Sequence, residues 1–174
     1  IILRDYITMY NIIYMKRDSL DKIDIKILSI LQENGRITNV ELAEKVELSA
    51  PPCLRRVRSL EKSGFIKGYH ADLASDKLGF EVTVFAMVGL HNQAESDLRL
   101  FEERVSLLPY VRECHMLNGE IDFILKCVAP DLTAFQSFLT NELTSAPNVS
   151  SVKTSLTIRE SKYSPGIPID LRNQ

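Results

Sequence analysis

The sequence predicts an α+β protein that has two domains. Short helix-forming segments fill the first third of the chain, and β-rich segments alternate with amphipathic helices over most of the rest. The 174 residues are 45% hydrophobic and 25% charged, as is usual for a globular protein. A chain of this length can bury a core without disulfides or metals.

Charge divides between the two parts. Residues 16–70 carry 11 Lys and Arg against 8 acidic residues, a net charge of +3, whereas residues 71–174 carry 9 against 14, a net charge of −5. The overall net charge of −2 hides this difference. The division indicates that only the first part contacts a polyanion.

Two short helices are predicted first. Asp21 precedes an apolar series at helical spacing, and Asn34-Gly35 supplies a stop signal, since glycine readily takes the left-handed conformation beyond a helix end. Thr38 and Glu41 form a capping box that predicts the start of a second helix of about two turns.

A third predicted helix, residues 50–62, carries most of the arginines. Ser49 is expected to cap it, and Pro51 is tolerated in its first turn. Its apolar side should face the core, so we expect Cys53 to be a buried structural thiol rather than a reactive one. Residues 65–73 are strand-like and are expected to form a wing or linker strand. The N-terminal domain is therefore predicted to be a helix-turn-helix, winged-helix-like.

This motif predicts DNA binding, because arginine binds phosphate oxygens or guanine bidentately and a helix N-terminus attracts phosphate. The alternative is an ordinary three-helix bundle whose arginine face is only solvated. The residues expected to contact DNA are Ser49, Pro51, Arg55, Arg56, Arg58 and Ser59.

The second domain is predicted to be ferredoxin-like, with the order β-α-β-β-α-β. Asn118-Gly119 is a tight-turn signal, so the middle two strands are expected to form a hairpin. Two helices would cover one face of the sheet, and the other face, partly apolar, favours dimerisation. Strands are expected over residues 80–90, 111–117, 120–128 and 149–159.

Few residues indicate other chemistry. Asp122 either receives an ammonium group or faces solvent at a strand end, and the sequence leaves both open. Glu113 and Glu120 are expected to be solvated acids rather than a catalytic pair. The three cysteines and three histidines lack metal-ligand spacing, so we expect no metal site and a reducing compartment.

The chain ends complete a division into four parts. Residues 1–15 are either an extension without function or an apolar segment that docks on a partner subunit; they are too short to span a membrane, and no membrane partner is expected. The helix-turn-helix domain spans 16–73 and the second domain spans 74–162. Residues 163–174 form a tail.

The sequence resembles the Lrp/AsnC (feast/famine) family of transcription regulators from about Leu20 to Lys162. The motifs that carry the resemblance include Pro52-Cys53-Leu54-Arg55-Arg56-Val57-Arg58, Gly64-Phe65-Ile66, Glu113-Cys114-His115 and Gly119-x-x-Asp122. The resemblance implies an N-terminal domain that binds double-stranded DNA and a C-terminal ligand-binding domain that forms homodimers, which assemble to octamers. Matching the family's effector-responsive positions gives Met116, Gly119, Asp122, Leu132, Thr144 and Leu156.

We therefore expect a cytoplasmic, sequence-specific DNA-binding regulator that is not an enzyme, needs no cofactor and responds to a free amino acid. Leucine is one candidate effector, but Glu120 and Ser155 depart from the family pattern and leave its identity open. One alternative is an enzyme of the same two-domain plan, similar to sirohaem decarboxylases. Another is a sensing module that has lost DNA binding.

Overall fold

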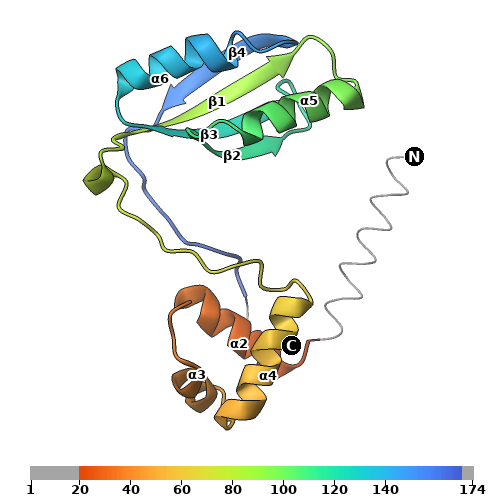
Figure 1. The fold of residues 1–174 in the computed structure, drawn as a ribbon, viewed down its shortest axis with the longest axis vertical. Helices are drawn as coiled ribbons and strands as arrows, with labels where there is room; N and C mark the ends of the chain where they lie inside the picture. Colours follow the sequence, from red (N-terminus) through yellow and green to blue (C-terminus); the bar gives the residue numbers. More distant parts are fainter. Residues whose placement is uncertain (1–19, 170–174) are drawn as a thin grey trace. The chain divides into compact units, whose positions relative to one another are not determined.

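The computed structural model describes residues 20–169 (Figure 1). The expectation for residues 1–15 falls outside this range. The chain divides into two compact units, of which the second is Asp72–Lys162. The described part of the first unit comprises residues 20–71 and 163–169. The segment that follows Lys162, expected as a separate tail, therefore groups with the helical unit.

Three helices build the described part of the first unit, and two of them begin as the sequence predicted. The Asp21 side chain accepts a hydrogen bond from Asp24 N at 2.8 Å, and Thr38 Oγ1 accepts one from Glu41 N at 3.2 Å. Both are capping boxes, in which the acidic side chain also bonds back to the cap residue. The helices are α2 (Lys22–Glu33), α3 (Asn39–Lys45) and α4 (Ala50–Lys62).

The core of this unit lies among the three helices. Glu47, in the turn between α3 and α4, has a left-handed φ of 60°, so a non-glycine residue makes the sharp change of direction in the motif. The buried side chains are Ile27, Leu42, Ala43, Val46, Cys53 and Leu60.

The expected wing strand is absent from the described part of the chain. Residues 66–74 have no regular secondary structure, and the next element is a single 3-10 turn, η1 (Asp76–Leu78). A strand requires a neighbour with which to pair its N–H and C=O groups, and the described residues of the first unit form no strand. Strand-like composition alone was therefore a misleading signal here.

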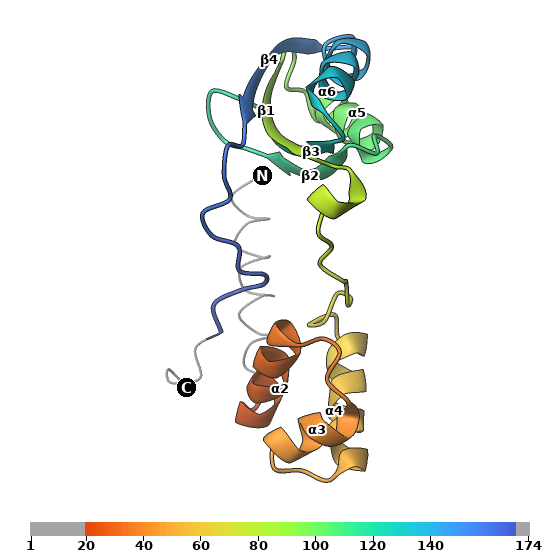
Figure 2. The ribbon, with the colours of Figure 1, turned by 90° about the vertical axis from the view of Figure 1, so that its left-hand side faces the viewer.

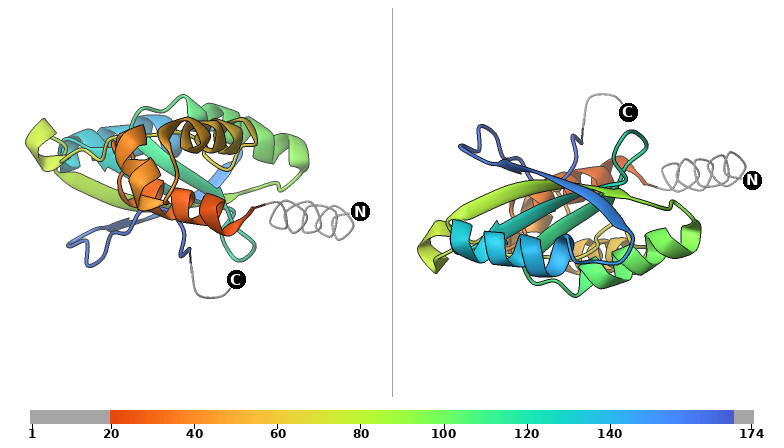
Figure 3. Two further views of the ribbon diagram at one scale, coloured as in Figure 1. Left: turned by 90° about the horizontal axis from the view of Figure 1, so that it is seen from below. Right: turned by 90° about the horizontal axis from the view of Figure 1, so that it is seen from above.

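The second unit has the predicted ferredoxin-like plan. Its four strands form one antiparallel sheet in the order β2-β3-β1-β4. Figures 2 and 3 show both long helices on the same face of this sheet. The elements are β1 (Val82–Leu90), α5 (Glu95–Ser106), β2 (Val111–Met116), β3 (Phe123–Ala129), α6 (Leu132–Phe138) with a π turn η2 (Leu139–Leu143), and β4 (Val149–Leu156).

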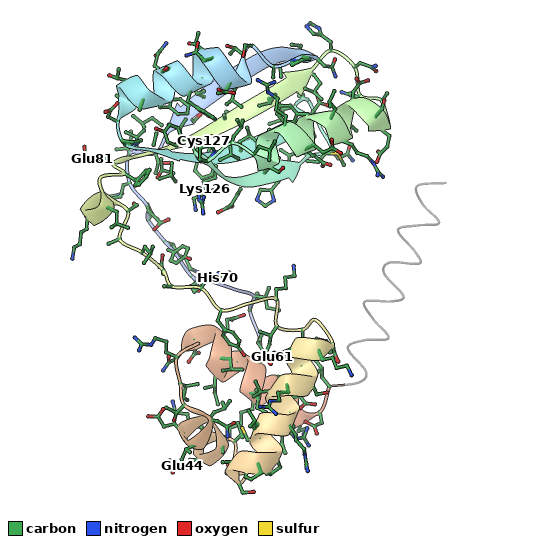
Figure 4. The ribbon with its side chains drawn as sticks, in the orientation of Figure 1. Glu44, Glu61, His70, Glu81, Lys126 and Cys127 are labelled. Carbon is green, nitrogen blue, oxygen red and sulfur yellow. The ribbon has the colours of Figure 1, made fainter. Side chains whose placement is uncertain are left out.

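The core of the second unit lies between the sheet and these helices. Every second residue of β3 is buried, beginning at Phe123, whose ring centroid lies 4.7 Å from that of Phe101 on α5. Lys126 and Cys127 are neighbours on β3, and Figure 4 shows them at the strand. Cys127 is fully buried, whereas Lys126 belongs to the opposite, uncovered face, because successive side chains of a strand alternate.

The β2–β3 connection differs from the predicted tight turn. β2 ends at Met116 and β3 begins only at Phe123, so a six-residue loop replaces a two-residue turn at Asn118-Gly119. Leu117 N donates to Asp122 O at 2.8 Å and closes this loop. Asp122 thus continues the pairing with Leu117, and its side chain also accepts the Leu90 N–H at the end of β1.

Candidate nucleic-acid interface and effector site

α4 turns one side to the core and another to solvent. Cys53 is fully buried, Leu60 nearly so, and Val57 packs against the same cluster. Burial raises the pKa of the Cys53 thiol above its ordinary value, which agrees with a structural role for this cysteine. The helix is thus anchored through the apolar side that the sequence predicted.

The exposed side of α4 carries cationic and small polar side chains. Ser49, Pro51, Arg55, Arg58 and Ser59 are all exposed. Residues three and four apart lie on the same side of a helix, so most of this set forms one row. Lys62 lies four residues after Arg58 and is also exposed. Lys62 was not among the residues predicted to contact DNA, although its i+4 spacing from Arg58 was the available signal.

Arg56, also predicted to contact DNA, is less exposed than Arg55 and Arg58 and pairs with two carboxylates. Its Nη1 lies 2.7 Å from Asp21 Oδ2 and 2.8 Å from Asp24 Oδ1, and its side chain is only 33% exposed. The guanidinium therefore joins α4 to the start of α2. Helical spacing on α4 did not predict this contact, because it depends on the two carboxylates at the start of α2.

Electrostatics reinforces this contact. Hydrogen bonds to Asp24 and Asp21 raise the pKa of Arg56 above its ordinary value. The pKa of Asp21 is lowered, mainly because its carboxylate accepts the backbone N–H of Asp24 and further because Arg56 lies beside it. Asp21 and Arg56 consequently stay charged, and the hydrogen bond between them is charge-assisted.

The N-terminus of α4 offers fewer phosphate ligands than most helices do. Ser49 has the extended backbone of an N-cap residue, but its side chain makes no capping hydrogen bond, contrary to expectation. Pro51 and Pro52 have no N–H group, so two first-turn donors are missing. The Asn39 side chain holds this end of the helix instead, donating to Ala50 O at 2.9 Å. The positive charge on this side of α4 therefore lies on the side chains of Arg55, Arg58 and Lys62.

In the second unit, Asp122 is buried rather than solvent-facing. Its side chain is hydrogen-bonded to β1, since Oδ2 accepts the Leu90 N–H at 2.6 Å. Its own N–H donates to Val88 O at 3.0 Å. Among the buried residues of the part of the chain that the structure describes, Asp122 is the only one of the four types Asp, Glu, Lys and Arg. A carboxylate has capacity to accept several hydrogen bonds, so Asp122 can bind a further donor.

The other five predicted effector residues are exposed, and one chain does not bring them together. Met116 and Gly119 lie near the end of the sheet where Asp122 meets β1, and Thr144 follows η2 at the start of the turn toward β4. Leu132 begins α6 directly after β3, and Leu156 ends β4. These two leucines lie at the opposite end of the sheet.

The strand register shows how large this separation is. Met116 pairs in the row of Phe123 and Val88, whereas Leu156 pairs with Val84. The two side chains are thus roughly 13 Å apart along the strands and roughly 14 Å apart across three inter-strand gaps. A free amino acid cannot bridge that distance within one chain.

A small cavity of about 130 Å³ opens elsewhere in the second unit, between α5 and the turn before β4. It is bordered by Asp97, Leu100, Phe101, Arg104, Pro147 and Asn148. None of the six predicted effector residues borders it.

Glu113 and Glu120 have different surroundings. Glu113 Oε1 lies 3.0 Å from Lys126 Nζ and its Oε2 lies 3.3 Å from His115 Nε2. The hydrogen bond from Lys126, and then that from His115, hold the pKa of Glu113 below its ordinary value. Glu113 is therefore an ion-pair partner, and Glu120 is exposed in the loop.

Residues 20–169 contain no cluster of three or more His, Cys, Asp or Glu side chains arranged to hold a metal ion. Within the same range, no helix combines the length and apolar character that a membrane span requires.

Comparison with known families matches both units. A model described as a winged helix-turn-helix DNA-binding domain matches residues 20–67. A model described as the Lrp/AsnC ligand binding domain matches residues 83–167.

Named relatives agree with these matches. A leucine-responsive regulatory protein of Rhizobium meliloti is 54% identical over 146 residues, which cover 84% of this chain and 94% of the relative. The leucine-responsive regulatory protein of Escherichia coli K12 is 40% identical over 153 residues, covering 88% and 93%.

Solved structures show the same likeness. A crystal structure of a transcriptional regulator from Neisseria meningitidis in complex with L-Met has a TM-score of 0.82 and 38% identity, covering 87% of this chain and 98% of that chain. An AsnC family regulator from Agrobacterium tumefaciens has a TM-score of 0.81 and 33% identity, covering 88% and 99%. These similar proteins are regulators, which favours regulation over the decarboxylase-like alternative.

Proposed function

Since the chain belongs to the Lrp/AsnC family of transcription regulators, we propose that it binds operator DNA through the exposed side of α4 and responds to a free amino acid. The observation that carries the DNA part is the row of Arg55, Arg58 and Lys62 on a helix whose opposite side is anchored in a core. This is the arrangement of a recognition helix in the major groove.

Different side chains of α4 serve different purposes in this proposal. Arg55 and Arg58 reach DNA, where a guanidinium binds phosphate oxygens or the O6 and N7 atoms of guanine. Ser59 and Lys62 add contacts to the DNA backbone. Arg56 acts indirectly, because its ion pairs with Asp21 and Asp24 hold α4 against the start of α2.

The effector part rests on Asp122. Its buried carboxylate suits the ammonium group of an amino acid, because a paired charge is tolerated in a buried place where an unpaired one is costly. Exposed apolar side chains at Met116, Leu132 and Leu156 suit an apolar side chain of the effector. The relatives named for leucine and the neighbour bound to L-Met support leucine and methionine as the first candidates.

We place the complete effector site between copies of the chain. The six predicted effector residues lie at two ends of the sheet, so one copy supplies Asp122 and its neighbours while another supplies Leu132 and Leu156. The amino acid would then stabilise whichever assembly contains the complete site, because a ligand favours the state that binds it better.

Dimerisation uses the uncovered face of the sheet. Both long helices cover the other face. On the open side, Phe85 is exposed, and Met87, Ile124 and Val128 are only partly buried. A second copy is a suitable partner, since the same patch on both subunits makes a closed, symmetric interface. Two helix-turn-helix units in one dimer would read two half-sites. Octamers, formed from such dimers, are the larger assembly proposed, and the cytoplasm is the proposed location.

Selecting DNA from a random pool with the purified protein tests this proposal. We expect enrichment of a two-fold symmetric motif, and a change in its enrichment or affinity when L-leucine or L-methionine is added. Failure to enrich any sequence would contradict DNA recognition. Enrichment that stays identical with both amino acids and with an amino-acid mixture would contradict the effector part. Incubation with sirohaem and mass spectrometry of the product tests the enzymatic alternative.

A further inference from the structure

The segment that follows β4 binds α2 through one glutamine. Gln32 Nε2 donates to the backbone carbonyl of Ile167 at 2.8 Å, and Ile167 N donates back to Gln32 Oε1 at 2.9 Å. A primary amide that satisfies both backbone groups of one residue replaces the pairing that a strand neighbour would give. Two matched hydrogen bonds thus hold the tail at a defined register.

The tail sequence is built for this contact. Pro165-Gly166 is a turn signature, in which proline sets φ near its fixed value and glycine takes a positive φ. Gly166 has a φ of 82°, and a Cβ atom at this position would overlap the Gln32 side chain. Glycine therefore suits the positive φ, and its missing side chain leaves room for the Gln32 amide in its observed position.

Because of this contact, the chain connects the two units twice. It leaves the first unit after Ala71 and returns to it at Tyr163. The returning connection, residues 157–162, starts at the end of β4, where Leu156 lies. Gln32 receives the tail on α2, the helix that also supplies Asp24 to the ion pair with Arg56.

We propose that residues 163–169 are a latch that couples the effector domain to the position of the DNA-binding helices. Movement of β4, on which the predicted effector residue Leu156 lies, is passed through residues 157–162 to Gln32. α2 then carries it to Asp24, about 12 Å further along a rigid helix, and so to Arg56 on α4. The coupling rests on the proposed effector function, whereas the docking of the latch does not.

Two variants release the latch without touching α4 or the predicted effector residues. Gln32→Ala removes both hydrogen bonds, and the added Cβ of Gly166→Ala occupies the space of the Gln32 amide and so breaks its contact with the tail. Gly79→Ala is the matched control, because Gly79 has a similar φ of 77° but no atom near the position of an added Cβ. Any effect of backbone strain alone will appear in the control as well.

Hydrogen exchange of the full-length protein tests the docking. We expect the Ile167 amide to be protected in the wild type and in Gly79→Ala, and to exchange at least tenfold faster in both latch variants. An Ile167 amide that already exchanges at the rate of an unstructured peptide in the wild type would overturn the latch. Thermal melting of the same samples shows whether each variant is folded.

DNA affinity measured with and without L-leucine or L-methionine tests the coupling. Where the wild type responds to either amino acid, we expect the latch variants to keep DNA affinity within about threefold and to lose most of the response, while Gly79→Ala keeps it. Equal responses in the wild type and the latch variants would overturn the coupling. A wild type that binds no DNA would instead contradict the proposed function, so the two failures are distinguishable.

Discussion

Arg55 and Arg56 are adjacent in sequence and differ in surroundings. Arg55 is exposed, whereas Arg56 is held by the carboxylates of Asp21 and Asp24. A single helical turn can thus contain one arginine that is free to bind an external anion and one that forms ion pairs within the domain. The distinction matters for mutagenesis, because loss of either side chain can lower DNA binding for a different reason.

We predict that Arg56→Ala lowers the free energy of unfolding of the first unit by about 1 kcal/mol, since charge-assisted hydrogen bonds are lost but the site is partly screened by solvent. Arg55→Ala should leave this free energy within about 0.5 kcal/mol of the wild type. Urea unfolding followed by circular dichroism measures both. Equal stability of the two variants would contradict a structural role for Arg56.

The same ion pairs predict an acid dependence. The folded-state pKa of Asp21 lies below its ordinary value of 3.8, so its contribution to stability is complete above that pH and is lost as pH falls through the lowered pKa. Asp21→Asn should therefore flatten the stability curve of the first unit below about pH 4. Asp76→Asn, which changes an exposed acid elsewhere, is the control. Parallel curves for wild type and Asp21→Asn would count against this assignment.

Asp122 allows its structural and binding roles to be separated. Asp122→Asn keeps an oxygen for the Leu90 N–H but removes the charge, so the fold should survive while affinity for the amino acid falls by roughly 10- to 100-fold. Asp122→Ala leaves that N–H without its partner and should cost about 1–3 kcal/mol of stability. Calorimetric titration and thermal melting measure the two effects. Unchanged affinity in Asp122→Asn would rule out an ammonium contact.

At the scale of elements, the open face of the sheet gives a fourth prediction. Phe85→Glu puts a charge in the proposed subunit interface, so the dimer should dissociate at concentrations where the wild type remains assembled. Phe80→Glu is the matched control, because Phe80 is equally exposed but precedes β1. Native mass spectrometry measures the assembly. Dissociation of both variants, or of neither, would not fit an interface on this face.

Elements with strong local signals were predictable from the sequence. The Thr38 capping box, the apolar series that follows Asp21, and the alternating apolar residues of β1 and β3 specify helices and strands through short-range chemistry. The failures depended on long-range contacts. The tail, for example, is held by Gln32, 135 residues away from Ile167.

The candidate site shows the same limit. The exposure of Arg55 and Arg58 follows from helical spacing on α4. The partial burial of Arg56 instead depends on its ion pairs with carboxylates at the start of α2, a separate element. Asp122 was left open because its spacing fits a solvent-facing strand end, and only the fold brings Leu90 N–H to its carboxylate. Contacts between elements, rather than propensities within them, decided these cases.

For the whole molecule, the division of charge assigns separate tasks. The basic first part meets the polyanion, and the acidic second part is suited to assembly and to binding an ammonium group. Wild-type affinity for operator DNA should therefore fall steeply with salt, because each phosphate contact releases a counterion.

The most direct test measures how operator affinity depends on salt in the double variant Arg55→Ala/Arg58→Ala. If α4 meets DNA through this side, affinity should fall and the slope of log K against log salt should become shallower by up to about 2, or about 1 for each phosphate contact removed. Arg99→Ala, an exposed arginine on α5, should match the wild type. A double variant with the affinity and slope of the wild type would contradict the account.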